Sequence, residues 1–286
     1  MSGSSANLGV CFFADRILYA LNDQQESKRL FHIGSLDFNF NIVEALGDRT
    51  SSEFKHIQRT IDWFKSEYDI RSVRALTHPT YECWTTLPKV VYDNADEREH
   101  HLSILMKGVP REDIEPTWHH IHNTDYRFLC LRRRSLMNGF DELTSQIALT
   151  DFSSDFEIAQ KWSSFAKPGG SFLMVGCHRN LISITSFLLG KFRAATFIRF
   201  DDLDDLPYHW LQQSAYSSWL RGIHEYIFLF GHQTHEVEQA LHGLWDSAGE
   251  ITILDSLHKM GVTADEETYG FDLAAAFPAI LLALDE

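Results

Sequence analysis

The sequence predicts an α/β protein with two lobes, because strand-like and helix-like segments occur twice along the chain in nearly the same order. The length agrees with this prediction: 286 residues, of which 44% are hydrophobic, suffice for two separate cores. The expected lobes are residues 1–150 and residues 151–286, which meet at the polar stretch 151–154.

The first half begins with strands and continues with a helix and a buried strand. Strands are expected at residues 8–13, 17–21 and 29–40, the helix at 52–68 and the last strand at 69–76. Residues 14–16 form a short polar turn between the first two strands. The helix is predicted because Phe54, Ile57 and Ile61 recur every three or four residues, which places them on one face.

Residues 93–131 depart from this plan, because they are rich in charged residues and histidine. Within them a helix is expected at 97–107 and a strand at 126–131. We therefore expect an inserted subdomain near residues 93–131, and a further helix follows at 134–147.

The second half repeats the order of the first. Strands are expected at 171–177, 181–188 and 192–200, a helix at 206–221, a strand at 226–230, a helix at 235–245, a strand at 251–254 and a final Ala-rich helix at 271–284. The acidic run 201–205 lies at the start of the predicted helix 206–221, where negative charge interacts favourably with the helix dipole. The two halves are thus expected to be duplicated units, with the last helix packing back toward the first lobe.

Composition excludes several classes of function. A net charge of −15 repels phosphate backbones, so we expect no nucleic-acid binding. No apolar run approaches the roughly 20 residues of a membrane-spanning helix, and the first seven residues lack a signal-peptide pattern. The expectation is a cytoplasmic protein without direct membrane insertion.

Cysteine and histidine do not form a recognisable metal pattern. The cysteines are far apart, have apolar neighbours and are expected to be buried free thiols: Cys11, Cys83, Cys130 and Cys177. The histidines of the middle region include adjacent pairs, whose side chains point in different directions, and no cysteine completes a tetrahedral set: His100, His101, His119, His120 and His122. The group His232, His235 and Glu236 suits the start of a helix equally well. No metal site is therefore predicted, and the common hydrolase, P-loop and zinc-protease motifs are absent from the sequence.

The duplicated order of elements resembles the superfamily of actin, sugar kinases and heat-shock chaperone ATPases, whose two lobes are built from ribonuclease-H-like βββαβα units. It is most similar to the PilM-like proteins of type IV pilus assembly and their type II secretion relatives. Three segments carry the resemblance: FLMVGCHRN and the strands after it resemble the second phosphate hairpin, IFLFGHQTHEVEQALHGLW the adenosine motif, and AAAFPAILLAL the closing helix. The resemblance covers nearly the whole chain and implies an actin-like fold.

The motifs that hold nucleotide in this superfamily are altered here. In the first phosphate hairpin, Cys11 stands at the usual Asp position and Phe13 at the usual glycine, while Asp15 and Arg16 lie in the turn. In the second hairpin, the expected D-x-G is replaced by Val175, Gly176 and Cys177, followed by His178 and Arg179. The resemblance therefore implies that the carboxylates that order magnesium and the glycines that admit phosphate are lost from both hairpins.

The adenosine motif is altered at one of its two glycines. Gly231 is retained, but His232 replaces the second glycine. An imidazole at this position can stack on a base or fill the space that nucleotide occupies in active relatives.

Two functions follow from these residues. The first is a non-catalytic cytoplasmic scaffold or adaptor that binds a protein partner and needs no cofactor. Aromatic residues that can anchor its interface include Trp84, Trp118, Trp210 and Trp219. The alternative is a divergent ATP-binding protein or phosphotransferase, using magnesium in the cleft between the lobes, with a substitute set of residues: Asp15, Arg16, His178, Arg179 and Gly231. A structural homodimer is a third possibility.

Overall fold

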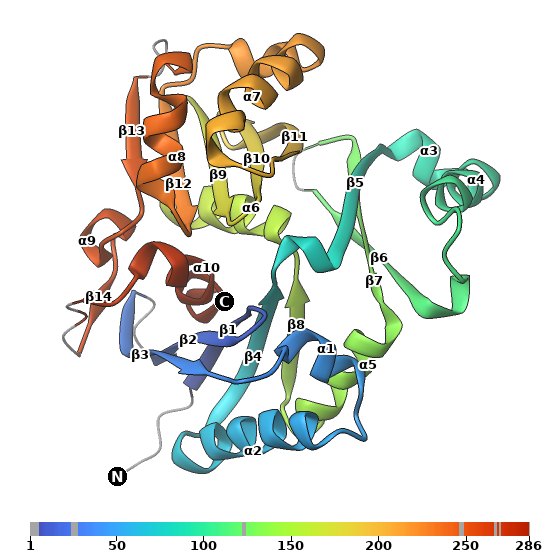
Figure 1. Ribbon diagram of the computed structural model, residues 1–286, viewed down its shortest axis with the longest axis vertical. Coiled ribbons are helices and arrows are strands. Elements are labelled where there is room, and N and C mark those ends of the chain that lie inside the picture. Colours follow the sequence, from blue (N-terminus) through green and yellow to red (C-terminus); the bar gives the residue numbers. More distant parts are fainter. Residues whose placement is uncertain are drawn as a thin grey trace.

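Two mixed sheets with their helices form two stacked lobes, and a smaller sheet projects to one side (Figure 1). The structure is a computed structural model, and it describes residues 6–23, 28–121, 124–245, 249–265, 268 and 270–285.

The first lobe contains a six-stranded sheet in the order β14-β3-β2-β1-β4-β8. Its strands are β1 (Ala6–Phe12), β2 (Arg16–Asp23), β3 (Arg29–Asp37), β4 (Ile70–Thr77), β8 (Leu149–Ser153) and β14 (Thr263–Ala264). Its outer face is covered by α1 (Ile42–Gly47), α2 (Ser52–Glu67) and α5 (Arg134–Leu143). Alternate strand residues face opposite sides of a sheet, so Leu8, Val10 and Phe12 of β1 enter the core under these helices.

The second lobe contains a five-stranded sheet in the order β11-β10-β9-β12-β13. Its strands are β9 (Ser171–His178), β10 (Leu181–Leu188), β11 (Lys191–Arg199), β12 (Tyr226–Gly231) and β13 (Glu250–Ile253). The helices α7 (Leu206–Tyr216) and α8 (Thr234–Leu241) cover one face. The strand order and directions repeat those of β3-β2-β1-β4-β8 in the first lobe. The central strand β9 is antiparallel to β10 and parallel to β12, just as β1 is antiparallel to β2 and parallel to β4. The predicted duplication of the α/β unit is confirmed.

Two helices lie between the sheets and join the lobes. They are α6 (Asp155–Ala166), which packs against β10, and α10 (Leu273–Leu284), which packs against β1, β2, β4 and β12. All twelve residues of α10 are buried. The helix lies so close to β1 that a Cβ atom at Gly9 would stand 2.0 Å from the carbonyl oxygen of Ala279. Glycine at this position therefore permits the contact between the last helix and the first sheet. The short helix α9 (Leu257–Met260) precedes β14 on the way back to the first lobe.

The small sheet is an insertion between β4 and α5. It consists of β5 (Glu82–Pro88), β6 (Ile114–His120) and β7 (Tyr126–Arg133), with α3 (Lys89–Asp93) and α4 (Ala95–Leu105) beside it. The sheet begins before the expected insertion at 93–131, because β5 pairs with β7 along its whole length. It also touches the second lobe, where the rings of Trp84 and Phe197 lie 5.8 Å apart. Short 3₁₀ turns complete the chain at Pro79–Tyr81, Arg111–Asp113, Leu203–Asp205, Ser218–Arg221 and His242–Leu244.

Three predicted helices are shorter than expected. The helix predicted at 134–147 ends at Leu143, that at 206–221 ends at Tyr216, and that at 235–245 ends at Leu241. In the second case Arg221 Nε donates a hydrogen bond to the carbonyl oxygen of Ser214 at 2.9 Å, which turns the chain back against the helix end. Within the described part of the chain, no helix is long and apolar enough to cross a membrane.

Candidate functional site

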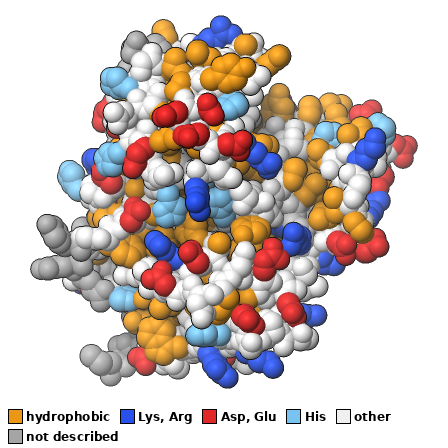
Figure 2. Space-filling view, in the orientation of Figure 1, with side chains coloured by type: hydrophobic (Ala, Val, Ile, Leu, Met, Phe, Trp, Pro, Cys, Tyr) orange, Lys and Arg blue, Asp and Glu red, His pale blue; other side chains and the backbone are white. Residues whose placement is uncertain are grey.

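An open cleft lies between the lobes, where the β1–β2 and β9–β10 hairpins face each other. Its volume is about 960 Å³. Its lining residues come from both lobes: Phe13, Ala14, Asp15, Arg16, Asn39, Phe40, Asn41, His78, Thr80, Tyr81, Arg179, Asn180, Asp201 and His232. In Figure 2, basic and histidine side chains gather in this hollow. The cleft therefore lies where the sequence resemblance places a nucleotide.

Aromatic and imidazole rings close the floor of this cleft. The ring of Phe13 lies 5.0 Å from that of His232 and 6.4 Å from that of His78. His78 in turn lies 4.8 Å from His178, edge to face. The space that remains beneath them, beside Cys11 and other apolar residues, is about 10 Å³. This is about the volume of one water-sized probe, so the floor is filled by the protein's own side chains.

A buried carboxylate lies behind these rings. Asp155, the first residue of α6, has its Oδ1 atom 3.2 Å from Nε2 of His178. Burial alone would raise the pKa of Asp155, but the neighbouring His178 and hydrogen bonds from His178 and Ser183 outweigh burial and lower that pKa. The carboxylate is therefore ionised, and it lies against His178 behind the rings instead of facing the cleft.

His78 is held as a neutral imidazole. The backbone N–H of Thr80 donates a hydrogen bond to Nδ1 of His78 at 3.3 Å. The ring proton is accordingly on Nε2. Burial, together with the charges of His178 and His232, lowers the pKa of His78 to about 3 although Asp155 acts in the opposite direction. At neutral pH His78 thus brings no positive charge to the cleft.

His232 is tied to the start of α10. Its Nδ1 atom lies 3.7 Å from Oδ2 of Asp272, whose other carboxylate oxygen accepts a hydrogen bond from the backbone of Ala275 at 3.0 Å. The neighbouring imidazole of His232 is the main reason that the pKa of Asp272 is lowered. This contact keeps the imidazole over Phe13.

The structure brings most of the predicted site residues to the cleft. Those that line its open part are Phe13, Asp15, Arg16, Arg179 and His232, and those that lie beneath it are Cys11, His178 and Gly231. Two residues lie elsewhere: Cys177 is in the core under α7 and α8, and Gly176 packs against Ser183 and Phe230. The retained Gly231 has a packing reason, because it has a φ of 100° and a Cβ atom there would lie 2.1 Å from the carbonyl oxygen of Cys177.

Sequence reasoning missed Asp155, His78 and Asp272. One signal was present for Asp155, since Ser154 and Glu157 form a capping box that places it in the first turn of a helix. The other two belong to a turn after β4 and to the cap of α10, and nothing in the local sequence indicates that either residue meets the hairpins.

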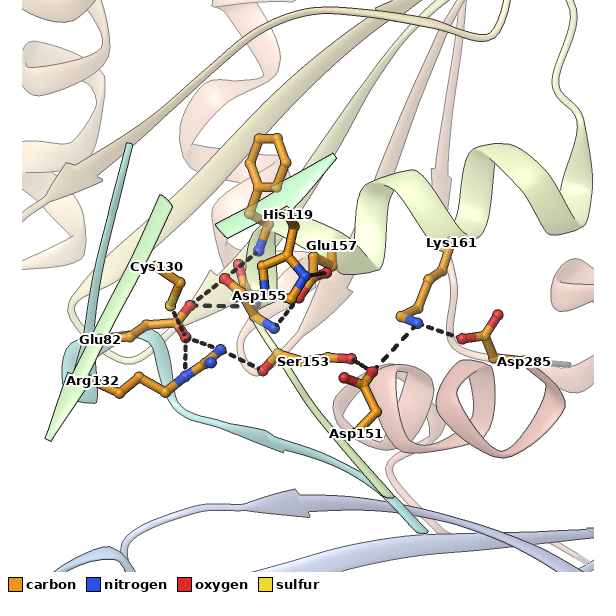
Figure 3. A network of polar contacts seen from close by, with 12 residues as sticks. Glu82, His119, Cys130, Arg132, Asp151, Ser153, Asp155, Glu157, Lys161 and Asp285 are labelled. Atoms are coloured by element: carbon orange, nitrogen blue, oxygen red, sulfur yellow. Dashed lines mark hydrogen bonds and ion pairs between the residues drawn. The ribbon is translucent and has the colours of Figure 1, made fainter. Parts of the chain in front are cut away.

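A buried ion pair connects the small sheet to the cleft (Figure 3). Glu82 of β5 accepts hydrogen bonds from Nε and a terminal nitrogen of Arg132 of β7, at 3.1 and 2.8 Å. The other carboxylate oxygen of Glu82 accepts from Ser154 Oγ at 2.5 Å and from the backbone of Asp155 at 3.3 Å. Arg132 also donates to the carbonyl oxygen of Ser153 at 2.8 Å. The small sheet is thereby fixed to the turn that leads from β8 into α6 and positions Asp155.

Two further ion pairs extend this network. His119 of β6 has Nδ1 3.2 Å from Oε1 of Glu157, whose pKa is raised because it is buried. On the next turn of α6, Lys161 pairs with Asp285 after the last helix, as Figure 3 shows. The polar stretch 151–154, taken from the sequence as the lobe boundary, is thus the end of β8 and the cap of α6, where the chain crosses toward the second sheet.

The histidines considered as metal ligands have other neighbours. His119 faces Glu157, His232 faces Asp272, and His235 has Nε2 3.8 Å from a carboxylate oxygen of Asp255. His122 lies outside the described residues. Within the described ranges, no group of three or more histidine, cysteine or acidic residues is arranged to hold a metal ion.

Two expectations about individual side chains are wrong. Cys83 is exposed, not buried, because it alternates with the buried Glu82 and Trp84 on the edge strand β5. Trp84 and Trp210 are buried in the core and cannot anchor an interface.

Thiol labelling should follow this burial pattern. In the native protein we expect Cys83 alone to react with a thiol reagent, more slowly than a free thiol because partial burial raises its pKa. The other thiols are buried and have raised pKa values, so they should react only after unfolding. Counting labelled sites by mass spectrometry checks this, with Cys83→Ser as the unlabelled control. Native labelling of Cys11 would contradict the filled floor.

Comparison with known proteins identifies the fold. No protein-family profile and no curated protein sequence matches the chain. Among solved structures, PilM in the PilM–PilN type IV pilus biogenesis complex is similar over 97% of both chains, with a TM-score of 0.62 and 12% identity. A Bacteroides thetaiotaomicron protein of unknown function with an actin-like ATPase fold is similar over 88% of this chain and 91% of its own, with a TM-score of 0.57 and 12% identity. The chain therefore has the actin-like ATPase fold.

Proposed function

We propose that this protein is a non-catalytic cytoplasmic scaffold or adaptor that binds a protein partner and whose nucleotide cleft is degenerate. The observation that carries the proposal is the filled floor of the cleft. Phe13, His78 and His232 form the base of the open cleft, and the space beneath Phe13 and His78 is only about 10 Å³. A triphosphate needs backbone N–H groups and open space at this position.

The donors at the hairpins also suit magnesium poorly. Magnesium prefers oxygen ligands in octahedral geometry. Cys11 and Cys177 offer thiols whose pKa values are raised by burial, so they stay protonated. The nearby carboxylate, Asp155, is engaged by His178 and Ser183. Phosphoryl transfer depends on metal ions that neutralise developing charge, and these residues do not fit such an ion.

Partner binding has independent support from a structural neighbour. PilM, which shares this fold, is found in a complex with PilN. The four free cysteines of this chain suit a reducing compartment such as the cytoplasm. The proposed scaffold therefore presents a surface of its lobes to another protein and does not process a nucleotide.

The alternative function, ATP binding, is favoured by one observation. The outer cleft remains open at about 960 Å³, and Arg16 and Arg179 line it. Arginine forms strong, often bidentate hydrogen bonds to phosphate, and His178 and Gly231 lie directly beneath these side chains. Only a binding measurement separates this alternative from the scaffold.

A thermal scan with nucleotide tests the proposal. A ligand at a hundred times its Kd stabilises the native state by about 2.7 kcal/mol. We expect no rise in Tm with millimolar ATP or ADP, with or without magnesium, because the floor is filled. The matched control is Arg179→Ala, which removes an outer-cleft cation. A magnesium-dependent rise that disappears in this variant would overturn the scaffold proposal and establish the ATP-binding alternative.

A further inference from the structure

The outward face of α7 carries large apolar side chains in solvent. Tyr208 is 65% exposed, Leu211 54% and Tyr216 85%. The helix is anchored through Leu206 and Trp210, which are buried in the second lobe. Because residues three or four apart share a helix face, Tyr208, Leu211 and Ala215 form a separate, exposed stripe. Figure 2 shows hydrophobic side chains at the surface around this helix.

Ile223, which follows α7 in the chain, is a further exposed apolar residue. It is 78% exposed although the chain around it is fixed. Arg221 donates to the carbonyl oxygen of Ser214 at 2.9 Å, and Ser171 Oγ donates to the carbonyl oxygen of Ile223 at 3.2 Å. We call the set Tyr208, Leu211, Ala215, Tyr216 and Ile223 the α7 surface. Large apolar side chains exposed on a fixed element are typical of an interaction site.

An acidic edge lies at the start of α7, where Asp202, Asp204 and Asp205 are exposed. The neighbouring strand β11 carries the exposed arginines Arg193 and Arg199. From 201 to 225 the sequence contains five acidic residues and a single arginine, whose Nε atom is engaged by the Ser214 carbonyl oxygen. An apolar centre with an acidic edge complements a partner that is apolar and basic.

We propose that the α7 surface docks a basic amphipathic segment of a partner protein; this inference rests on the scaffold function. The eleven residues of α7 span roughly 16 Å, at 1.5 Å per residue, which matches about three turns of a partner helix with apolar residues at i, i+3, i+4 and i+7. A second copy of this chain fits less well, because a symmetric contact would bring two acidic edges into one interface.

Selection from a random peptide library tests this partner chemistry. The probe is a library of random 16-residue peptides displayed on phage and selected on the whole protein. We expect the selected peptides to combine lysine or arginine with leucine or aromatic residues at helical spacing. Their synthetic forms should protect backbone amides between 206 and 223 from hydrogen exchange.

Matched variants locate the binding surface. Truncating two anchors by Tyr208→Ser and Leu211→Ser should weaken binding about tenfold or more. Because both side chains are exposed, the fold should persist, which circular dichroism checks. The control exchanges two exposed apolar residues of the small sheet's helices, Val90→Ser and Ile104→Ser, and should bind as the unaltered protein does.

Charge variants test the acidic edge. Replacing Asp204 and Asp205 by asparagine should weaken peptide binding several-fold and reduce its dependence on salt, since screened attraction is removed. A selection that returns no basic apolar peptides, or peptides that bind the Tyr208 and Leu211 variant equally well, would overturn the proposal. So would self-association in sedimentation that this variant abolishes. Peptides that bind the small sheet instead would refute the α7 surface as the docking site but would leave the scaffold function intact. Magnesium-dependent ATP binding, by contrast, would refute the scaffold function itself.

Discussion

Replacing Glu82 by glutamine should lower the free energy of unfolding by about 3–5 kcal/mol, the usual loss when one partner of a buried ion pair is removed. The side chains of Glu82 and Arg132 are both completely buried. Without the carboxylate charge, the guanidinium of Arg132 keeps only the carbonyl oxygen of Ser153 as a strong acceptor. Denaturant unfolding monitored by circular dichroism measures the change.

Two comparisons make this result specific to the buried pair. The double variant Glu82→Met, Arg132→Met should lose less than the single variant, because no charge is then left unpaired in the core. Glu44→Gln, which breaks an exposed pair with Arg133, should leave the unfolding curve unchanged. A Glu82→Gln protein as stable as the unaltered protein would show that the small sheet is not fixed to α6 through this pair.

Acid should destabilise the protein through His78, and His78→Asn should reduce the effect. In the unfolded chain His78 titrates at its ordinary pKa of 6.5, whereas in the folded protein its pKa is about 3. Between these values the unfolded state binds a proton that the folded state does not, so stability is complete above pH 6.5 and falls as pH is lowered toward 3. The loss is on the order of 2–4 kcal/mol. Asparagine retains an acceptor for the Thr80 N–H but does not titrate.

The measurement is the free energy of unfolding between pH 7.5 and 4.5, above the range in which most carboxylates titrate. We expect a shallower decline in His78→Asn than in the unaltered protein. His100→Asn, at an exposed position of α4, is the control and should decline as steeply as the unaltered protein. If stability declined with pH equally steeply in His78→Asn and in His100→Asn, His78 would not be held neutral in the cleft floor.

The duplicated sheets could be predicted from sequence because their strands are short apolar runs bounded by turns. The strand expected at 181–188 is β10 with the same bounds, and β9 and β12 differ from their predictions by one residue at the end. The strands β5, β6, β8 and β14 were not predicted. They lack long apolar runs: β6 contains Pro116 and no fully buried residue, and β8 is buried at only two positions. Such strands are defined by pairing partners distant in sequence.

The resemblance also predicted that Cys11 and Phe13 replace the usual Asp and glycine of the first hairpin. It did not indicate which way the strand residues face. Cys177 points into the core of the second lobe because alternate residues of β9 face opposite sides.

The sequence by itself thus determined the repeated α/β plan and the positions of the two hairpins. The loss of magnesium-ordering carboxylates from these hairpins stays a prediction from the resemblance. Only the tertiary structure decided that the cleft floor is filled, since Phe13, His78 and His232 come from three separate elements. It also decided that Asp155 lies behind His178, and that Glu82 and Arg132 pair across the small sheet. The reason is physical: periodicity and turn chemistry are local properties of the chain, whereas ring contacts and buried ion pairs depend on side chains that meet only when the sheets pack together.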